Sequence, residues 1–213
     1  MFKDRKDAGQ KLAEALRAYM GEEPLVLAIP RGGVMVGYQV ARNLHCDLAI
    51  IVVRTLPFPD NSEAGFGAIA EDGSIYFVDR APRLLPIGTI EQVIKEQKLE
   101  IKRRIDILRE GKSLPALKNR TVILVDDGIA MGSTMHAAIM LCKNNDAAKI
   151  IVAAPVAGPS IAADLAEVVD RVVILKKPPY FRAVAQAYEN WYDVPDEEVI
   201  LIMQEYERLK RHT

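Results

Sequence analysis

Short, continuously apolar runs recur along the chain, and amphipathic segments lie between them. Runs of this kind are typical of parallel strands buried on both faces of a sheet. They occupy residues 25–29, 48–53, 121–125, 149–155 and 171–175. Segments with helical apolar spacing cover residues 4–19, 34–44, 133–144, 159–167 and about 195–209. The alternation predicts one α/β domain over residues 1–213, with a parallel sheet of about five strands flanked by helices on both faces.

The middle of the chain follows a different pattern. Residues 54–73 are rich in proline and glycine, which favours a loop. A small hairpin is predicted from residues 67–71 and 74–78, because the Asp-Gly between them favours a tight turn. Residues 89–92 have the form of a capping box, so a long amphipathic helix is expected to begin there and to end at Gly111. The hairpin and a C-terminal hood segment are the expected additions to the sheet.

The residues that follow each apolar run are the site candidates, because ligands of open parallel sheets bind beyond the carboxyl ends of the strands. The run at 121–125 ends at Asp126 and Asp127, and a loop of small residues follows. Two glycines and two hydroxyl residues in such a loop can form a nest of donors for phosphate. These are Gly128, Gly132, Ser133 and Thr134. Adjacent acids do not bind phosphate, but they accept hydrogen bonds from a sugar diol, and one can reach Mg²⁺ through water.

A plainer interpretation of this stretch is an Asp-Gly turn in which the acid caps the next helix. That interpretation accounts for neither the second acid nor the second glycine and the two hydroxyls in fixed order. The loop is also not a Walker A loop, and it is not the Gly-x-Gly-x-x-Gly dinucleotide motif. A ligand that carries a phosphate beside a sugar diol is therefore favoured.

Residues 122–134 resemble the signature of the type I phosphoribosyltransferases, in which apolar residues and two acids precede Gly-x-Ala-x-Gly and a hydroxyl residue. The resemblance implies that Asp126 and Asp127 are the catalytic acids, which hold the ribose hydroxyls of phosphoribosyl pyrophosphate and approach Mg²⁺ through water or substrate. It implies a 5′-phosphate loop made of Gly128, Ala130, Met131, Gly132, Ser133 and Thr134. Position 131 is usually threonine in this signature, so Met131 removes a hydroxyl donor.

The resemblance extends to other parts of the chain. Residues 29–33 resemble the family's pyrophosphate loop, which implies pyrophosphate binding by Arg31, Gly32, Gly33 and Arg54. Without the first motif, Arg-Gly-Gly would be read as a surface turn. Thr55 stands where relatives often have lysine. The blocks 2–9, 65–73 and 183–189 resemble a group of bacterial and archaeal members of this family, so the resemblance covers nearly all of the chain.

The implied reaction replaces pyrophosphate at the anomeric carbon with a nitrogenous acceptor, expected to be a nucleobase, with Mg²⁺ as cofactor and with water excluded. A closing loop is expected within residues 79–120, where Arg103 and Arg104 are candidate cations for pyrophosphate. The alternative for these arginines is a solvated helix face. Lys176, Tyr180 and Phe181 are the candidate base-binding residues, although the aromatic side chains could equally serve packing.

Composition narrows the choice of partners and compartment. The chain has 213 residues and a formal net charge of −1, so nucleic acid is not an expected partner. Its two cysteines stand apart in the sequence, which argues against a structural zinc site and fits a cytoplasmic location. No signal peptide and no membrane-spanning run are recognised. A homodimer is expected.

Two other functions fit parts of the same pattern. The first is a non-catalytic protein that binds phosphoribosyl pyrophosphate or a nucleotide and regulates a partner, and the Met131 and Thr55 departures motivate it. The second is an unrelated α/β hydrolase for a phosphorylated sugar, in which Asp126 or Asp127 holds the metal. Substituting Asp127→Asn separates them, since it weakens ribose binding in the first and abolishes metal-dependent hydrolysis in the second.

Overall fold

A parallel sheet of five strands forms the centre of the molecule in the computed structural model, as the apolar runs predict. The structure describes residues 1–211, apart from the side chains of residues 62 and 63, so the last two residues of the predicted domain lie outside the description. The strand order is β2-β1-β6-β7-β8. The strands are β1 (Leu25–Ala28), β2 (Asp47–Ile50), β6 (Thr121–Val125), β7 (Lys149–Val156) and β8 (Arg171–Lys176).

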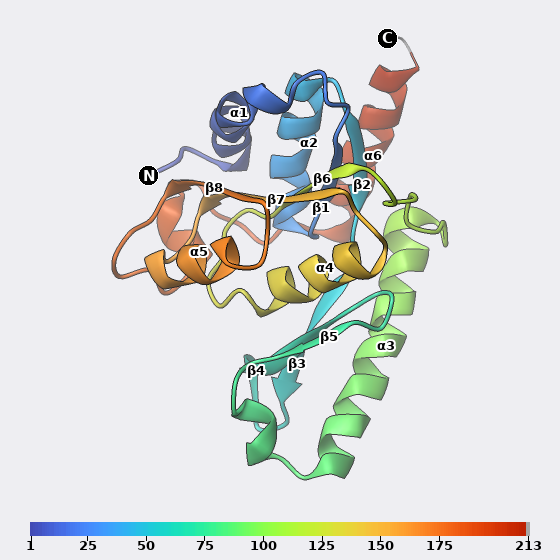
Figure 1. The fold of residues 1–213 in the computed structure, drawn as a ribbon, viewed down its shortest axis with the longest axis vertical. Coiled ribbons are helices and arrows are strands. Elements are labelled where there is room, and N and C mark those ends of the chain that lie inside the picture. Colours follow the sequence, from blue (N-terminus) through green and yellow to red (C-terminus); the bar gives the residue numbers. More distant parts are fainter. Residues whose placement is uncertain (212–213) are drawn as a thin grey trace.

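Helices cover both faces of this sheet (Figure 1). One face carries α1 (Arg5–Ala15), α2 (Gly32–Leu44) and α6 (Asp196–Lys210), and the other carries α4 (Ser133–Asn144) and α5 (Pro159–Ala166). Along β1, Val26 and Ala28 pack into the first layer, whereas Leu25 and Leu27 pack into the second. Both sets are buried, which explains why these strands read as continuous apolar runs rather than as alternating ones.

A second sheet of three antiparallel strands, β3-β4-β5, is inserted between β2 and β6. Its strands are β3 (Val53–Phe58), β4 (Asn61–Ala70) and β5 (Ile75–Phe77). The hairpin at Asp72-Gly73 is confirmed: Ser74 N–H donates to Asp72 Oδ1 at 2.8 Å, and Gly73 has a φ of 91°. The prediction of a loop at 54–73 is wrong, because most of β3 and all of β4 occupy it, and the predicted strand 48–53 is split after Ile50.

Glycine and proline in this segment serve strand pairing rather than a loop. Pro57 lies at a register shift between β3 and β4, where a missing N–H is tolerated. A Cβ atom on Gly67 would lie 2.4 Å from the Tyr76 carbonyl oxygen, so glycine allows β4 and β5 to approach closely. The same residues that favour a loop in the sequence therefore permit two bent, closely packed strands.

The long helix α3 (Ile87–Arg109) follows the second sheet. Its N-cap position is Pro86, and Thr89 lies inside the first turn, so the predicted capping box is wrong. Glu110 and Gly111 both have positive φ and end the helix, as expected at Gly111. The closing loop expected within 79–120 is therefore mostly a continuous helix. At its C-terminal end Arg109 pairs with Glu71 at 2.5 Å and donates to the Ile50 carbonyl at 2.9 Å, which fastens α3 to both sheets.

The N-terminal segment pairs with the C-terminal segment. Phe2 N–H donates to Ala187 O at 2.7 Å, Glu189 N–H to Phe2 O at 2.8 Å, and Asn190 N–H to Lys3 O at 2.9 Å. A β-bridge between Phe2 and Tyr188 therefore precedes the predicted helix at 4–19, which divides into α1 and a 3-10 turn at Arg17–Tyr19.

Two further 3-10 turns cover Ala81–Leu84 and Val184–Ala187. Within the described part of the chain, no helix is both long and apolar enough to cross a bilayer.

Candidate functional site

The two loops singled out in the sequence meet at the carboxyl ends of β1 and β6. These strands are hydrogen-bonded neighbours, and Ile29 N–H donates to Val125 O at 2.9 Å. A Cβ atom on Gly32 would lie 1.8 Å from Asp127 Oδ2, and one on Gly33 would lie 3.0 Å from the Asp126 Cα. Only glycine fits at Gly32 without displacing the acid. The peptide bond between Pro30 and Arg31, at the turn into α2, is cis.

Asp127 is buried and paired with Arg5, which was not among the predicted site residues. Arg5 Nε donates to Asp127 Oδ2 at 2.8 Å, and Arg5 Nη1 donates to the Tyr192 carbonyl at 2.9 Å. The Arg5 guanidinium also lies 3.9 Å from the centre of the Trp191 ring, and Tyr188 Oη donates to the Asp127 carbonyl at 2.5 Å. Burial raises the pKa of Asp127, and the positive charge of Arg5 opposes that rise. This pairing fixes the orientation of Asp127 and occupies one of its carboxylate oxygens.

Asp126 is the freer of the two acids. Its side chain is partly buried, and its Oδ1 accepts the Asp127 N–H at 2.8 Å. Burial, followed by the negative charge of Asp127, raises the pKa of Asp126 well above its ordinary value. The site therefore carries a carboxylate whose charge lacks a nearby partner of its own, and a hydroxyl donor or a cation would stabilise the ionised form.

Mg²⁺ fits this arrangement in one specific way. Carboxylate oxygen is a ligand that Mg²⁺ prefers, and the ion is commonly held by one or two carboxylates together with substrate phosphates. Within the described residues, no group of three or more metal-ligating side chains is found. Asp126 would therefore hold the ion jointly with the substrate, while Asp127 is engaged by Arg5.

The loop that follows the acids leads directly into α4. Gly132 has a φ of 78° and occupies the N-cap position, and the first backbone hydrogen bond of the helix runs from His136 N–H to Gly132 O at 2.9 Å. The N–H groups of residues 133–135 consequently have no intrahelical acceptor, as an anion site at a helix N-terminus requires. Ser133 is buried and Thr134 is partly buried, whereas the Met131 side chain is 55% exposed. A Cβ atom on Gly128 would lie 2.6 Å from Val184, so the loop packs tightly against the C-terminal segment.

Four arginines gather beside the loop at 31–33. Arg54 donates from Nε to Gln97 Oε1 at 3.1 Å, and burial together with the positive charges of Arg104, Arg103 and Arg31 lowers its pKa. Arg103 and Arg104 each pair with Glu100, at 2.7 and 2.9 Å. Arg103 and Arg104 both lie on α3, near enough to Arg54 for their charges to act on it.

Asp196 is the acid that faces these cations and that sequence reasoning missed. It is the first residue of α6, and its Oδ1 lies 3.7 Å from Arg31 Nη1. Among the described residues, this buried oxygen accepts no hydrogen bond. A ligand that displaced the Arg31 side chain would therefore break only a long ion pair.

Two of the three candidate base-binding residues lie at the cluster around Phe2, and the third is exposed. Lys176 Nζ donates to the Met1 carbonyl at 3.3 Å and lies 4.6 Å from the centre of the Phe2 ring. Tyr180 is 89% exposed, and Phe181 packs against the cluster that Phe2 and Tyr188 belong to. These three residues stay predictions as acceptor contacts. Thr55, the other departure, packs against Gly65, whose Cβ position lies 2.4 Å from Thr55 Cγ2.

A signal for Arg5 was available in the sequence. Arg5 lies on the same helical stripe as Ala8 and Leu12, which are buried. A charged residue on a buried stripe needs a charged partner, and the acid pair at 126–127 is a natural one. Tyr188 and Trp191 carried no comparable signal, because their contacts depend on how the C-terminal segment folds back over the site.

Comparison with known proteins identifies the family. A model of the phosphoribosyl transferase domain matches residues 2–185. The Mycobacterium tuberculosis protein named "Putative phosphoribosyl transferase Rv0571c" is 38% identical over 205 residues, which cover 95% of this chain and 46% of that protein. The crystal structure of TT1426 from Thermus thermophilus superposes with a TM-score of 0.81 and 36% identity, covering 96% of this chain and 98% of that one.

The chain therefore belongs to the type I phosphoribosyltransferase family. It spans about half the length of the curated relative from M. tuberculosis. The fold expected from the resemblance is confirmed, both by the sheet order and by the similarity to TT1426.

Proposed function

We propose that the protein transfers a phosphoribosyl group from phosphoribosyl pyrophosphate to a nitrogenous acceptor, in a Mg²⁺-dependent reaction, and that the acceptor is a nucleobase. The observation that carries the proposal is the direct packing of Gly32 and Gly33 against Asp127 and Asp126. This packing brings together the loop at 31–33, the two acids and, after them, the N-terminus of α4, which supports the proposal. A ligand with a diphosphate, a sugar diol and a 5′-phosphate matches those three features in order.

In the proposed reaction, the acceptor nitrogen forms a bond to the anomeric carbon while the bond from that carbon to the pyrophosphate oxygen breaks. Pyrophosphate leaves with the bonding electron pair, and the acceptor nitrogen loses its proton to solvent. Asp126 accepts hydrogen bonds from the ribose hydroxyls, and Asp127, held by Arg5, fixes the position of Asp126 through its backbone N–H. Bound Mg²⁺ would supply positive charge to the leaving diphosphate.

The arginines near the loop at 31–33 would stabilise charge on the leaving group. Arg31 and Arg54 come from different elements, and Arg104 approaches from α3. Guanidinium groups bind phosphate oxygens in pairs of parallel hydrogen bonds. Closure over the site would then come from the ligand drawing Arg31 away from Asp196, rather than from a long flexible loop.

The test is pyrophosphate release from phosphoribosyl pyrophosphate and Mg²⁺ with a panel of purine and pyrimidine bases. We expect release with at least one base, and Asp126→Asn should lower kcat/KM about a hundredfold, as loss of one electrostatic contact in a reaction centre does. Asp164→Asn, an exposed aspartate on α5, is the matched control. Release with no base from a folded protein would count against the proposal.

A non-catalytic protein that binds phosphoribosyl pyrophosphate or a nucleotide is the second candidate. The exposed Met131 and the engagement of Lys176 by the Met1 carbonyl favour it, because both remove groups that would serve turnover. Calorimetric binding of phosphoribosyl pyrophosphate without any pyrophosphate release would select this candidate.

A metal-dependent sugar-phosphate hydrolase is less well supported, since the described residues offer no protein-only metal centre. It predicts phosphate release without an acceptor, abolished in Asp127→Asn.

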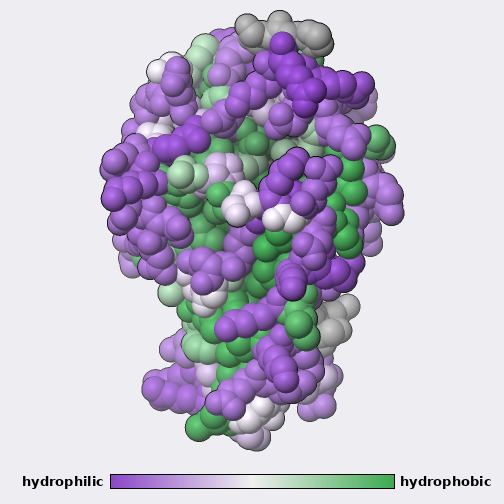
Figure 2. Space-filling model, turned by 90° about the vertical axis from the view of Figure 1, so that its right-hand side faces the viewer, coloured by the Kyte–Doolittle hydropathy of each residue, from purple (hydrophilic) through white to green (hydrophobic). Residues whose placement is uncertain are grey.

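We also propose a homodimer and a cytoplasmic location. Figure 2 shows the side of the molecule that α3 and α6 form, where hydrophobic side chains interrupt a largely hydrophilic surface. Leu99 on α3 and Leu201 on α6 are 64% and 62% exposed. Size-exclusion chromatography with light scattering measures the mass directly, and a dimer that dissociates in Leu99→Asp would place the interface on this side.

A further inference from the structure

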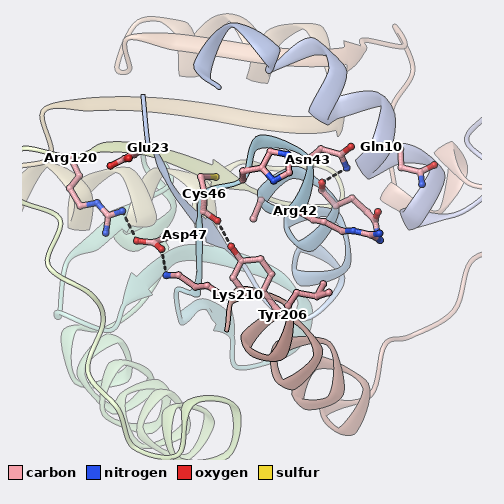
Figure 3. Close-up of a pocket in the computed structure, with 13 residues that line it drawn as sticks. Gln10, Glu23, Arg42, Asn43, Cys46, Asp47, Arg120, Tyr206 and Lys210 are labelled. Carbon is pink, nitrogen blue, oxygen red and sulfur yellow. Dashed lines mark hydrogen bonds and ion pairs between the residues drawn. The ribbon is translucent and has the colours of Figure 1, made fainter. Parts of the chain in front are cut away.

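A cavity lies at the opposite end of the parallel sheet from the candidate site. Its volume is about 690 Å³. Asp47, the first residue of β2, lines it, and so does Arg120, which directly precedes β6. The proposed phosphoribosyl site, by contrast, follows the last residues of β1 and β6. Figure 3 shows this cavity between the C-terminal ends of α2 and α6, with α1 at one side.

One wall of the cavity carries a buried amide without a partner. Gln39 is only 6% exposed and lines the cavity, and its side-chain amide takes part in no hydrogen bond among the described residues. The side chain passes directly over Gly9 of α1, where an added Cβ would lie 2.8 Å from Gln39 Cβ. Among the described residues, the fully buried side-chain atoms without a partner belong to Arg109 and Asp196, so the Gln39 amide reaches the cavity space and can hydrogen-bond a ligand there. Asn43 and Gln10 bring two further amides to the same wall.

The opposite wall carries two cations, Arg120 and Lys210, with Asp47 between them and Glu23 beside Arg120 (Figure 3). Arg120 Nη2 donates to Asp47 Oδ2 at 2.7 Å, and Lys210 pairs with Asp47 Oδ1. Each cation uses one donor for this acid and has others that point to no described acceptor. Arg42, at the end of α2, also lines the cavity but lies apart from this group of charges (Figure 3). The remaining donors of Arg120 and Lys210 suit an anionic ligand, and a guanidinium binds phosphate oxygens through two parallel hydrogen bonds.

We propose that this cavity binds a phosphorylated metabolite of about mononucleotide size, with the phosphate at Arg120 and Lys210 and the polar remainder at Gln39, Asn43 and Arg42. The volume is within the range of small-molecule sites, which is roughly 300–1,000 Å³. The site is distinct from the proposed phosphoribosyl site, because the two lie at opposite ends of the strands.

The two helices that border the cavity also reach the proposed pyrophosphate loop. Helix α2 begins at Gly32 in that loop, and its last turn provides Arg42 and Asn43. Helix α6 begins at Asp196, the partner of Arg31, and its last turn provides Lys210. The helices are joined midway by the Tyr38 hydroxyl, which donates to Glu205 Oε1 at 2.6 Å. A ligand that draws their C-terminal ends together changes the spacing of Arg31 and Asp196, so the cavity regulates pyrophosphate affinity.

The binding test uses a protein whose phosphate loop is blocked, so that nucleotides report only on the cavity. Met131→Asp places a negative charge in that loop, and the exposed position tolerates it. Adenosine, guanosine and uridine 5′-monophosphates and inorganic phosphate are titrated by calorimetry into this variant. We expect at least one nucleotide to bind, and the added pair Gln39→Leu and Arg42→Gln to weaken it about tenfold or more. Arg208→Gln, an exposed α6 arginine outside the cavity, is the control with the same charge change.

The coupling test measures pyrophosphate affinity in the Met131→Asp protein with and without the nucleotide that binds best. We expect a change of about fivefold or more, a common size for coupling between two sites, and no change in the Gln39→Leu, Arg42→Gln background. No binding by any probe, or equal binding with and without the cavity substitutions, overturns the site. Binding with an unchanged pyrophosphate affinity overturns the coupling. Neither measurement requires turnover, so failure of the proposed transferase activity leaves both results interpretable.

Discussion

Arg5 and Asp127 are 122 residues apart in the chain and form the most deeply buried ion pair of the site. A buried ion pair gains little over apolar packing, but loss of one partner strands the other charge away from water. The main effect of the pair is therefore to orient the side chains. Arg5 holds Asp127 against Gly32 and leaves Asp126 free to contact a ligand.

Arg5→Ala should lower the free energy of unfolding by about 3–5 kcal/mol, because it leaves Asp127 buried without a counter-ion. The double variant Arg5→Ala, Asp127→Asn should be more stable than Arg5→Ala alone, since it removes the stranded charge. Urea unfolding measures both. Lys6→Ala, at the exposed neighbouring position, should change stability by less than about 0.5 kcal/mol. Equal stability of the single and double variants would contradict the pairing.

Met131 stands where the family signature usually has a hydroxyl residue, and its exposed side chain contributes little to packing. Met131→Thr should therefore restore one donor at low structural cost. We expect affinity for ribose 5-phosphate to rise about threefold to tenfold, the gain of one net hydrogen bond. Met131→Val, which has the shape of threonine without the hydroxyl, should not bind more tightly than the natural protein. Equal gains in the two variants would show that side-chain size, not the hydroxyl, matters.

At the scale of elements, the central strands were predictable because burial on both faces leaves an unbroken apolar run, as at Val122 to Val125. The strands β3 and β4 could not be predicted, because Pro57 and the glycines at 65 and 67 locally favour a loop. They become strand residues only through the pairing of β3 with β4 and of β4 with β5. The residues of the candidate site show the same contrast. Its glycines and acids were predicted because they follow strand ends, whereas Arg5 and Asp196 lie on helices and come to the site only through helix packing.

Helix α3 presents chemically different faces toward and away from the proposed pyrophosphate loop. Arg104 is partly buried and near Arg54, whereas Lys102 is exposed. Arg104→Gln should weaken pyrophosphate binding about tenfold, the cost of a charge-assisted hydrogen bond, and Lys102→Gln should leave it nearly unchanged. The loss should shrink in high salt, because ions screen the charge interaction. Calorimetry at two salt concentrations measures this, and an equal effect of both substitutions would indicate only a general charge effect.

Across the whole molecule, one apolar cluster joins the two sheets. It includes Ile123 of β6, Phe66 of β4 and Ile101 of α3, so the inserted unit shares its core with the parallel sheet. The Arg109–Glu71 ion pair adds a polar contact at the C-terminal end of α3. These shared contacts favour one domain over two.

We therefore expect a single unfolding transition. Trp191, the one tryptophan of the chain, lies over Arg5 and reports on the site, while far-ultraviolet circular dichroism reports on all helices and strands. The two signals should change at the same urea concentration. Arg109→Leu should move both together, by about 3–5 kcal/mol, because Glu71 would be left buried without its partner. Separate midpoints for the two signals would show that the inserted unit unfolds independently.

The return of the C-terminal segment to the beginning of the chain has a consequence for how the protein is made on the ribosome. Tyr188 and Tyr192 hold Asp127 and Arg5 through a hydroxyl and a carbonyl. A nascent chain that has not yet exposed these residues carries both charges but lacks the Tyr188 and Tyr192 contacts that hold the pair in place. The proposed site is therefore assembled late in synthesis, and incomplete chains should remain unable to bind phosphoribosyl pyrophosphate even after their central strands have formed.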